Sequence, residues 1–157
     1  MDEIVARSLA KWPNVPAVYG WLELDRRGNW RIKGERITND ALKAFISRNY
    51  ECDAQGRWYF QNGPQRVFVT LAYTPFVVHH QGEALVDQCG KAFEKTALFV
   101  DDEGSLLVQG GGKIALLDDR DLLRYADQAD TLQRINRADV ARRFGFVPEP
   151  SASLHRP

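Results

Sequence analysis

The 157-residue chain has little of what marks a secreted or membrane-spanning protein. Its two cysteines, Cys52 and Cys89, are too few for a disulfide framework, and we expect them to be free buried thiols. No apolar run approaches the ~18 residues that a membrane span needs. The start, Met1-Asp2-Glu3, lacks the basic residues and the apolar stretch of a secretory signal. The sequence therefore predicts a cytoplasmic protein with no membrane partner.

The chain also lacks a charge of one sign, because Lys+Arg and Asp+Glu both number 21. This balance provides no general attraction to nucleic acid, which is therefore a disfavoured partner. A net charge near zero favours self-association, so a homo-oligomer is a candidate state. Hydrophobic residues make up 44% and charged residues 27%, which is ordinary for a globular domain.

Sequence signatures of catalysis are missing too. No serine lies in a G-x-S-x-G motif, and no C-x-x-C or H-x-x-x-H spacing indicates a metal site. The run Gly110-Gly111-Gly112-Lys113 resembles a phosphate loop, but Leu107 and Ile114 stand where that loop needs Gly and Ser or Thr. We expect no cofactor, no metal and no catalytic residue. Gly111 and Lys113 stay candidate ligand contacts, since a glycine backbone can approach an anion closely.

What the chain does contain is one turn pattern used three times. An apolar segment is followed by Asp-x-x-Gly and then by a second apolar segment. Asp suits the first position of a type I turn, and Gly suits the position with positive φ in a hairpin with a G1 bulge. The pattern predicts three β-hairpins, with turns at Asp25–Gly28, Asp53–Gly56 and Asp101–Gly104.

Helices are expected between and after these hairpins. Thr38 or Asn39 can cap a helix whose apolar face carries Leu42, Phe45 and Ile46. A short helix can start at Asp118 or Asp119, and another at Asn136, which Gly145 would close. The predicted fold class is α+β: antiparallel hairpins, one helix packed on the first sheet, a β-roll-like second half and short C-terminal helices.

The predicted core follows the apolar faces of these elements. The expected core residues are Leu24, Trp30, Ile32, Leu42, Phe45, Ile46, Trp58, Phe60, Val67, Val69, Leu71, Phe99, Leu106, Val108 and Leu116. The segment from Gln65 alternates, which predicts a half-buried strand with its odd-numbered residues inward. Because Pro64 follows Asn62-Gly63 and has no N–H to donate, we expect a wider loop there than a two-residue turn.

Aromatic and basic side chains in the second hairpin form a candidate binding surface. A flat ligand or a base could stack on Tyr59 and Phe68, flanked by Arg57 and Arg66. The alternative is structural: Trp58 and Phe60 belong to the core, and Tyr59 is a partly exposed edge residue. Trp58 and Tyr59 must project to opposite faces of a strand, so they cannot form one continuous platform.

His79 and His80 end an apolar run and form a second candidate site. In a strand they face opposite sides, so they cannot both bind one metal without a local bend. A zinc site that combines one of them with Cys52, Cys89 or Asp87 is chemically feasible. The alternative is a solvated turn beside Gln81-Gly82.

A basic segment near the C-terminus raises the question of nucleic-acid binding. Residues 138–146, ADVARRFGF, resemble the first helix of a helix-turn-helix unit. Only eleven residues follow Phe146, three of them proline, which leaves no room for a recognition helix. A solvated helix face is the simpler interpretation.

Three segments together resemble an uncharacterised, mainly proteobacterial family, a domain of unknown function. They are GNWRIKGERITNDALKAF, DAQGRWYFQNGPQRVFVTLAYTPFVV and LFVDDEGSLLV, within residues 20 to 125. The resemblance implies a first α+β lobe followed by a β-roll-like lobe, and a bacterial cytosolic source. It implies no reaction and no catalytic residues.

The expected organisation is one compact unit over residues 1–147, followed by a flexible tail, 148–157. A division into two lobes, about 17–77 and 78–128, with C-terminal helices in 129–147, is the alternative. The expected function is a non-catalytic module that binds a small molecule or a protein, including another copy through exposed strand edges. A small enzyme or metal-binding protein centred on His79 and His80 is the first alternative, and a nucleic-acid-binding protein is the second.

Overall fold

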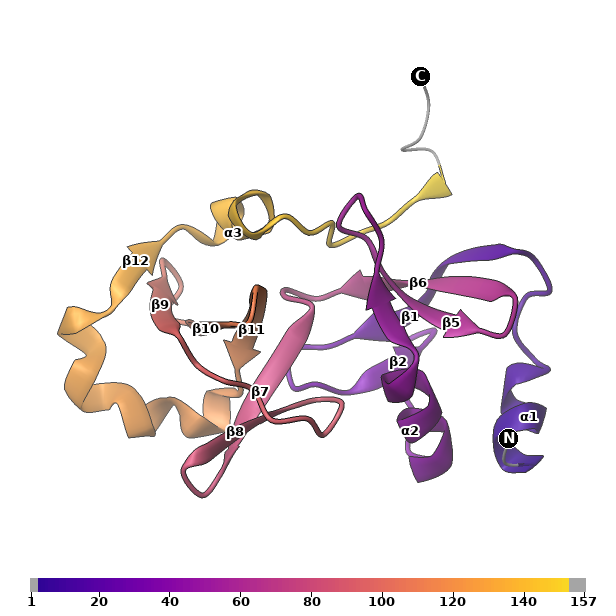
Figure 1. Ribbon diagram of the computed structural model, residues 1–157, viewed down its shortest axis with the longest axis horizontal. Helices are drawn as coiled ribbons and strands as arrows, with labels where there is room; N and C mark the ends of the chain where they lie inside the picture. Colours follow the sequence, from indigo (N-terminus) through magenta and orange to yellow (C-terminus); the bar gives the residue numbers. More distant parts are fainter. Residues whose placement is uncertain (1–2, 153–157) are drawn as a thin grey trace. The chain divides into compact units, whose positions relative to one another are not determined.

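A computed structural model describes residues 3–152, apart from the side chains of Ile4 and Ser8. These residues divide into two compact units (Figure 1), each described by itself. Of the described residues, unit 1 comprises 3–25, 29–72 and 147–152, and unit 2 comprises Arg26–Gly28 and Tyr73–Phe146. The change from unit 1 to unit 2 after Ala72 follows the end of strand β6, five residues before the lobe boundary expected from the sequence.

Unit 1 is built on a six-stranded mixed sheet in the order β3-β2-β1-β6-β5-β4. Its strands are β1 (Ala17–Leu24), β2 (Trp30–Ile32), β3 (Glu35–Arg36), β4 (Tyr50–Cys52), β5 (Trp58–Asn62) and β6 (Gln65–Leu71). Its helices are α1 (Glu3–Leu9) and α2 (Asp40–Arg48). β1 and β6 pair in parallel, with Leu22 opposite Val69, and the other neighbouring strands pair in antiparallel fashion. The α+β class predicted from the sequence is confirmed.

Helix α2 begins where its sequence predicts. The Asn39 side chain accepts a hydrogen bond of 2.8 Å from the Leu42 amide, so Asn39 is the N-cap. The buried side chains of α2 are Leu42 and Ile46, four residues apart on one face. Phe45 contacts Phe60 of β5 edge to face, with ring centroids 5.6 Å apart, which packs this helix against the sheet.

Unit 2 has a second six-stranded mixed sheet, in the order β12-β9-β10-β11-β7-β8. Its strands are β7 (Phe76–Gln81), β8 (Ala84–Asp87), β9 (Ala97–Asp101), β10 (Leu106–Gly110), β11 (Lys113–Leu117) and β12 (Gln133–Ile135). The remaining elements are a 3-10 helix, η1 (Asp119–Thr131), and α3 (Arg137–Phe144). Parallel pairs join β11 to β7 and β12 to β9, between strands that are distant in the sequence.

The Asp118 cap and the Gly145 helix end expected in unit 2 are confirmed, whereas the Asn136 side chain makes no capping hydrogen bond within the described residues. Asp118 caps η1, since its side chain accepts from the Arg120 amide at 2.9 Å. Asn136 occupies the N-cap position of α3, and Gly145 ends α3 with a φ of 73°, in the left-handed region that favours glycine. η1 is a 3-10 helix throughout, with Tyr125 as its buried residue and Leu123 largely exposed.

All three predicted hairpins are present, and a fourth turn has the same form. Asp87-Gln88-Cys89-Gly90 follows β8, and the Asp87 side chain accepts hydrogen bonds from the Cys89 and Lys91 amides at 2.8 and 3.1 Å. This turn was not predicted, because no second apolar strand follows it and only an isolated bridge joins Val86 to Ala92.

The loop expected at Asn62-Gly63-Pro64 is shorter than predicted. Asn62 pairs with Gln65, so Gly63 and Pro64 form a two-residue turn between β5 and β6. The prediction was wrong because Pro64 occupies a central position of the turn, where its missing N–H is not needed to close the hairpin. Gly63 has a φ of 55°, as such a turn requires.

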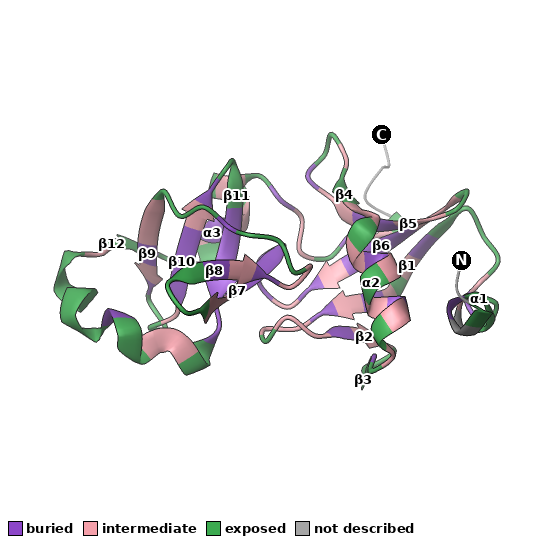
Figure 2. Ribbon diagram, turned by 60° about the horizontal axis from the view of Figure 1, so that its bottom comes forward, coloured by how far each residue is buried: buried purple, intermediate pink, exposed green. Residues whose placement is uncertain are grey.

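Most of the expected core is buried, and Figure 2 shows the burial concentrated along the strands. Three expected core residues, Ile32, Phe45 and Trp58, are only half-buried. Tyr59 is buried with 6% exposure because β5 is an inner strand between β6 and β4, so its expected place at a sheet edge is wrong. On β6 the odd-numbered Val67, Val69 and Leu71 are buried as predicted.

The C-terminal segment is described as far as Ala152. The Pro148 carbonyl accepts a hydrogen bond of 2.8 Å from the Leu71 amide, and Pro150 is buried. The rest of the tail predicted over 148–157 lies outside the described residues. Cys52 is exposed and Cys89 half-buried, and neither is in a disulfide, so the thiols are confirmed but their expected burial is wrong. No helix in the described part of the chain combines the length and apolarity that crossing a membrane requires.

Candidate functional site

A hollow of about 310 Å³ lies in unit 2 beside strand β7. We call it the β7 pocket. Val77, His79 and Gln81, three alternate residues of β7, line one wall, because side chains at i, i+2 and i+4 share one face of a strand. The other lining residues come from the Arg27-Gly28 turn, β8, the Asp87–Gly90 turn and the start of η1. The predicted site residue His79 therefore lies in a concave surface.

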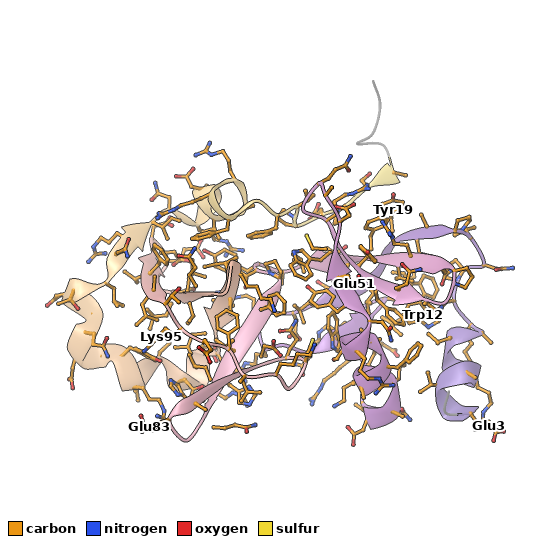
Figure 3. All side chains as sticks on the ribbon, viewed as in Figure 1. Glu3, Trp12, Tyr19, Glu51, Glu83 and Lys95 are labelled. Carbon is orange, nitrogen blue, oxygen red and sulfur yellow. The ribbon has the colours of Figure 1, made fainter. Side chains whose placement is uncertain are left out.

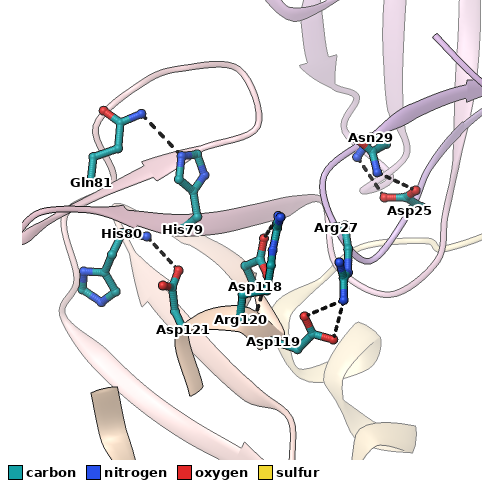
Figure 4. Close-up of polar contacts among 10 residues, drawn as sticks. All are labelled: Asp25, Arg27, Asn29, His79, His80, Gln81, Asp118, Asp119, Arg120 and Asp121. Atoms are coloured by element: carbon teal, nitrogen blue, oxygen red, sulfur yellow. Dashed lines mark hydrogen bonds and ion pairs between the residues drawn. The ribbon is translucent and has the colours of Figure 1, made fainter. Parts of the chain in front are cut away.

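His79 and His80 face opposite sides of β7, as the strand period predicts. The His79 ring contacts the Gln81 side-chain amide at 3.4 Å on the pocket side (Figure 4). The His80 ring contacts the Tyr125 hydroxyl at 2.7 Å, and its main-chain amide donates to Asp121 at 2.9 Å. The structure thus separates the two histidines: His79 lines the pocket, and His80 links β7 to η1.

The carboxylates around the β7 pocket are already satisfied by the fold. Asp87 and Asp118 are both 3% exposed. Asp87 accepts the two amides of its own turn. Asp118 accepts from the Arg120 guanidinium at 2.6 and 3.0 Å, and this hydrogen-bonded ion pair holds the pKa of Asp118 below its ordinary value. Both carboxylates therefore act as structural acceptors.

Two arginines belong to the same surface. Arg27 forms an exposed ion pair with Asp119 at 3.2 Å, and Arg120 pairs with Asp118 (Figure 4). Both guanidiniums remain accessible, since the side chains of Arg27 and Arg120 are 52% and 66% exposed. The pocket therefore offers cationic donors, an imidazole and an amide, while its acidic groups are occupied.

The aromatic and basic residues predicted in unit 1 do come together. Tyr59 and Phe68 pair across β5 and β6, with ring centroids 5.8 Å apart, and the Tyr19 ring stacks on Phe68 at 4.8 Å. The Arg66 guanidinium lies 3.9 Å from the Tyr59 ring centre, and that of Arg57 lies 4.6 Å from the Phe68 ring centre. Because Tyr59 and Phe68 are buried and the arginines contact their rings, the cluster presents no open ring pair for stacking.

Gly111 and Lys113 belong to the hairpin that joins β10 to β11. Gly110 pairs with Lys113, so Gly111 and Gly112 are the two turn residues, with φ of 56° and 76°. A two-residue turn with both φ values positive requires such residues. A Cβ at Gly110 would lie 1.9 Å from the Glu94 carbonyl oxygen, which accounts for the third glycine. Lys113 lies over the Phe76 ring at 4.9 Å.

The predicted site residues thus form three groups: the aromatic cluster in unit 1, and the histidines and the glycine turn in unit 2. Within residues 3–152 no three His, Cys, Asp or Glu side chains are grouped so that they could hold a metal ion. Three residues of the β7 pocket were not predicted from the sequence: Arg27, Gln88 and Arg120. Arg27 and Gln88 each lie inside an Asp-x-x-Gly turn, which was the available signal.

Comparison with known proteins identifies a family but no activity. The model of the DUF2944 family, described as "Protein of unknown function (DUF2946)", matches residues 1–151. No curated protein matches the chain in sequence. Two solved structures are similar in fold, both of DUF1285 family proteins. The one from Silicibacter pomeroyi DSS-3 has a TM-score of 0.56 and 18% sequence identity, and the match covers 81% of this chain and 84% of that protein's chain. The one from Shewanella baltica OS155 has a TM-score of 0.52 and 10% sequence identity, and the match covers 69% of this chain and 91% of that protein's chain.

Proposed function

We propose that this chain, which belongs to the DUF2944 family of proteins of unknown function, is a non-catalytic module that binds a small polar molecule in the β7 pocket. The expectation of an uncharacterised family is confirmed, and the family gives no activity to transfer. The proposal places the protein in the cytosol, where its two cysteines would stay reduced.

The observation that supports binding is the set of groups in the pocket wall. His79 and Gln81 are held side by side on a rigid strand, with two exposed guanidiniums nearby. The buried carboxylates Asp87 and Asp118 are already paired, so they do not compete for a ligand's donors. A volume of about 310 Å³ lies in the range of small-molecule sites. A compact ligand with acceptor groups, such as a carboxylate or a phosphate, suits these donors.

The reason for proposing binding without catalysis is the surroundings of the histidines. A catalytic imidazole is usually oriented by a carboxylate or a similar group and faces a nucleophile. In the described part of the chain, His79 contacts an amide and His80 contacts a phenol, and neither ring bonds to a carboxylate. This arrangement provides no activated nucleophile.

A small molecule is favoured over strand-to-strand self-association by the sheet edges. The edge strands β3, β4, β8 and β12 are two to four residues long. Short edge strands are a common protection against pairing with another chain. A homo-oligomer and a complex with another protein stay proposals of lower rank. Either one would raise the molecular mass measured for the purified protein above that of a single chain.

The test is a thermal-shift screen of the full chain against carboxylates, phosphates, nucleotides and divalent metals. A ligand at a hundred times its dissociation constant stabilises the native state by about 2.7 kcal/mol, which moves the midpoint by several degrees. For a ligand of the β7 pocket, His79→Ala should weaken binding about tenfold, since one charged or neutral hydrogen bond is lost.

The matched control is His80→Gln, on the opposite face of the same strand. Glutamine can keep a hydrogen bond to Tyr125, so this variant should bind as the wild type does. Equal losses in both variants, or no ligand in the screen, would count against the β7 pocket. Stabilisation by Zn²⁺ that both histidine variants lose would support the metal-binding alternative instead.

A further inference from the structure

A second pocket, in unit 1, differs in chemistry from the β7 pocket. Its volume is about 370 Å³, and it lies between the segment after α1, the strands β1 to β3 and the first turn of α2. We call it the tryptophan pocket, because Trp12 and Trp21 line it. Trp12 (labelled in Figure 3) packs against Phe60 in an edge-to-face arrangement, with ring centroids 5.8 Å apart, which anchors this wall in the core of unit 1.

The walls of the tryptophan pocket are mainly apolar. Trp12, Ile37 and Leu42 are buried, with exposures of 7%, 7% and 4%. Trp21 and Ile32 are half-buried and complete the apolar lining. An apolar hollow of this size has a favourable free energy of filling, because a ligand removes its surface from water.

Two cations line this pocket, and a third contacts one of its walls. Lys11 and Arg36 line it, and the Lys33 ammonium lies 4.9 Å from the Trp21 ring centre. All three side chains are exposed, and among the residues the structure describes none of the three has an ion-pair partner. Glu35 is the one acidic residue among the described lining residues. Among the charged residues that line the pocket or contact Trp21, the positive ones therefore outnumber the negative one.

Lys33 is held in this position by an unusual backbone. Within residues 3–152 it is the one non-glycine residue with positive φ, at 51°. It occupies the first position of the two-residue turn between β2 and β3, where Asn, Asp or Gly is favoured. Its amide donates to the Trp21 carbonyl at 3.1 Å. A strained lysine beside a pocket is the kind of outlier that functional sites accumulate.

The Trp21 indole adds an unsatisfied donor. Its Nε1 atom is buried and has no hydrogen-bond partner within the described residues. A buried donor of this kind costs free energy unless an acceptor reaches it. Trp21 therefore contributes its ring to the pocket wall, and its buried indole N–H has no hydrogen-bond partner among the described residues.

We infer that the tryptophan pocket binds an amphiphilic anion, a molecule with an apolar body and one carboxylate. The body fills the space against Trp12, Trp21 and Leu42, and the carboxylate is paired by Lys33 and Arg36. A volume of about 370 Å³ corresponds to about a dozen water-sized volumes of ~30 Å³, and hence to a ligand of about a dozen heavy atoms. Decanoate has this size and chemistry. This site lies in unit 1 and does not depend on the β7 pocket.

The experiment is a titration of the full chain with decanoate and with the neutral alcohol 1-decanol, followed by tryptophan emission at low ionic strength. The wild type should show saturable binding of both, with decanoate at least tenfold tighter. The paired variant Lys33→Asn with Arg36→Gln should lose at least tenfold in affinity for decanoate and change that for decanol by less than twofold. Asparagine tolerates positive φ, so the turn at position 33 is retained.

His79→Ala serves as the control in unit 2 and should bind decanoate as the wild type does. Absent or non-saturable decanoate binding, or equal binding by the Lys33–Arg36 variant, would overturn the inference. Loss of decanoate binding in His79→Ala would assign the anion to the β7 pocket and also overturn it. Sedimentation of the same samples tests whether a second copy of the chain fills the pocket instead. If the wild type is a dimer that Trp21→Glu dissociates and that decanoate leaves unchanged, the pocket is a dimer interface and the inference is overturned.

Discussion

The Asp53 turn of unit 1 and the Asp101 turn of unit 2 have the same local structure and different partners. In each, the aspartate Oδ1 accepts hydrogen bonds from the main-chain amides two and four residues further along the chain. For Asp53 these donors are Gln55 and Arg57, both at 2.9 Å. For Asp101 they are Glu103 and Ser105, at 2.9 and 2.8 Å. In each, a glycine with positive φ follows three residues after the aspartate. The hairpin is therefore specified locally in both units.

The two turns differ in the donor that their second carboxylate oxygen accepts from. Oδ2 of Asp53 accepts from the Arg57 guanidinium at 2.8 Å, four residues away and partly in water. Oδ2 of Asp101 accepts from the Tyr73 hydroxyl at 2.8 Å, between two side chains that are almost fully buried. One motif can thus serve at the surface or join distant segments in a core, depending on the partner that the fold provides.

The largest expected difference is between Asp101→Ala and Asp53→Ala. Asp101→Ala leaves two amides and the Tyr73 hydroxyl without their acceptor in a buried site, so we expect a loss of about 3 kcal/mol or more in the free energy of unfolding. Asp53→Ala should cost about 1–2 kcal/mol, since water can reach its donors. Urea unfolding of both variants measures the difference. Equal losses would show that burial does not distinguish the turns.

A smaller effect is expected when only the second partner is removed. Tyr73→Phe keeps the ring but leaves Asp101 Oδ2 without its donor, and should cost about 1–2 kcal/mol. Arg57→Met keeps an apolar side chain over Phe68 and should cost about 1 kcal/mol or less. The same unfolding measurement applies. A larger loss for Arg57→Met would reverse the comparison.

The smallest expected effects are on the pH dependence of the free energy of unfolding. The Tyr73–Asp101 pair should lose stability at alkaline pH and the Asp53 turn at acid pH. Burial, with Asp101 as its hydrogen-bond acceptor, raises the pKa of Tyr73 above the ordinary value of 10.0. The folded state then keeps the phenol proton longer than the unfolded state, so this stabilisation is complete below 10.0 and lost as the pH rises further.

The Asp53 turn should instead weaken in acid. Burial alone would raise the pKa of Asp53, but hydrogen bonds from the Arg57 main chain and side chain and from the Gln55 amide outweigh it and hold the pKa below the ordinary 3.8. This stabilisation is present above 3.8 and lost as the pH falls through the folded value. Unfolding followed across pH checks both: Tyr73→Phe should flatten the alkaline side only, and Asp53→Asn the acid side only. A change on the opposite side in either variant would contradict the assignment.

Much of the local structure could be predicted because its interactions are short in sequence. The Asn39 cap of α2, the Asp118 cap of η1 and the Gly145 end of α3 each involve residues within a few positions of one another. The wrong predictions concern residues whose burial depends on a strand that is not adjacent in the sequence pattern. Tyr59 is buried because β4 covers the edge of β5, and no pattern within β5 indicates that.

The candidate sites were less predictable for the same reason. His79 was singled out from the sequence, but its companions Arg27 and Arg120 lie about fifty and forty residues away along the chain. The tryptophan pocket was not expected at all, because Trp12 lies in the segment after α1, Trp21 in β1 and Leu42 in α2. A pocket is a property of packed elements, so no local pattern specifies its volume or its lining.

The sequence by itself determined the hairpin turns, the helix caps and the opposite orientation of His79 and His80, since these depend on hydrogen bonds and periodicities within a few residues. Only the tertiary structure decided that β1 pairs in parallel with β6 and β11 with β7, which side-chain donor reaches each turn aspartate, and which side chains enclose the two pockets. Those features join segments tens of residues apart, and their stability comes from burial that exists only once both sheets have formed.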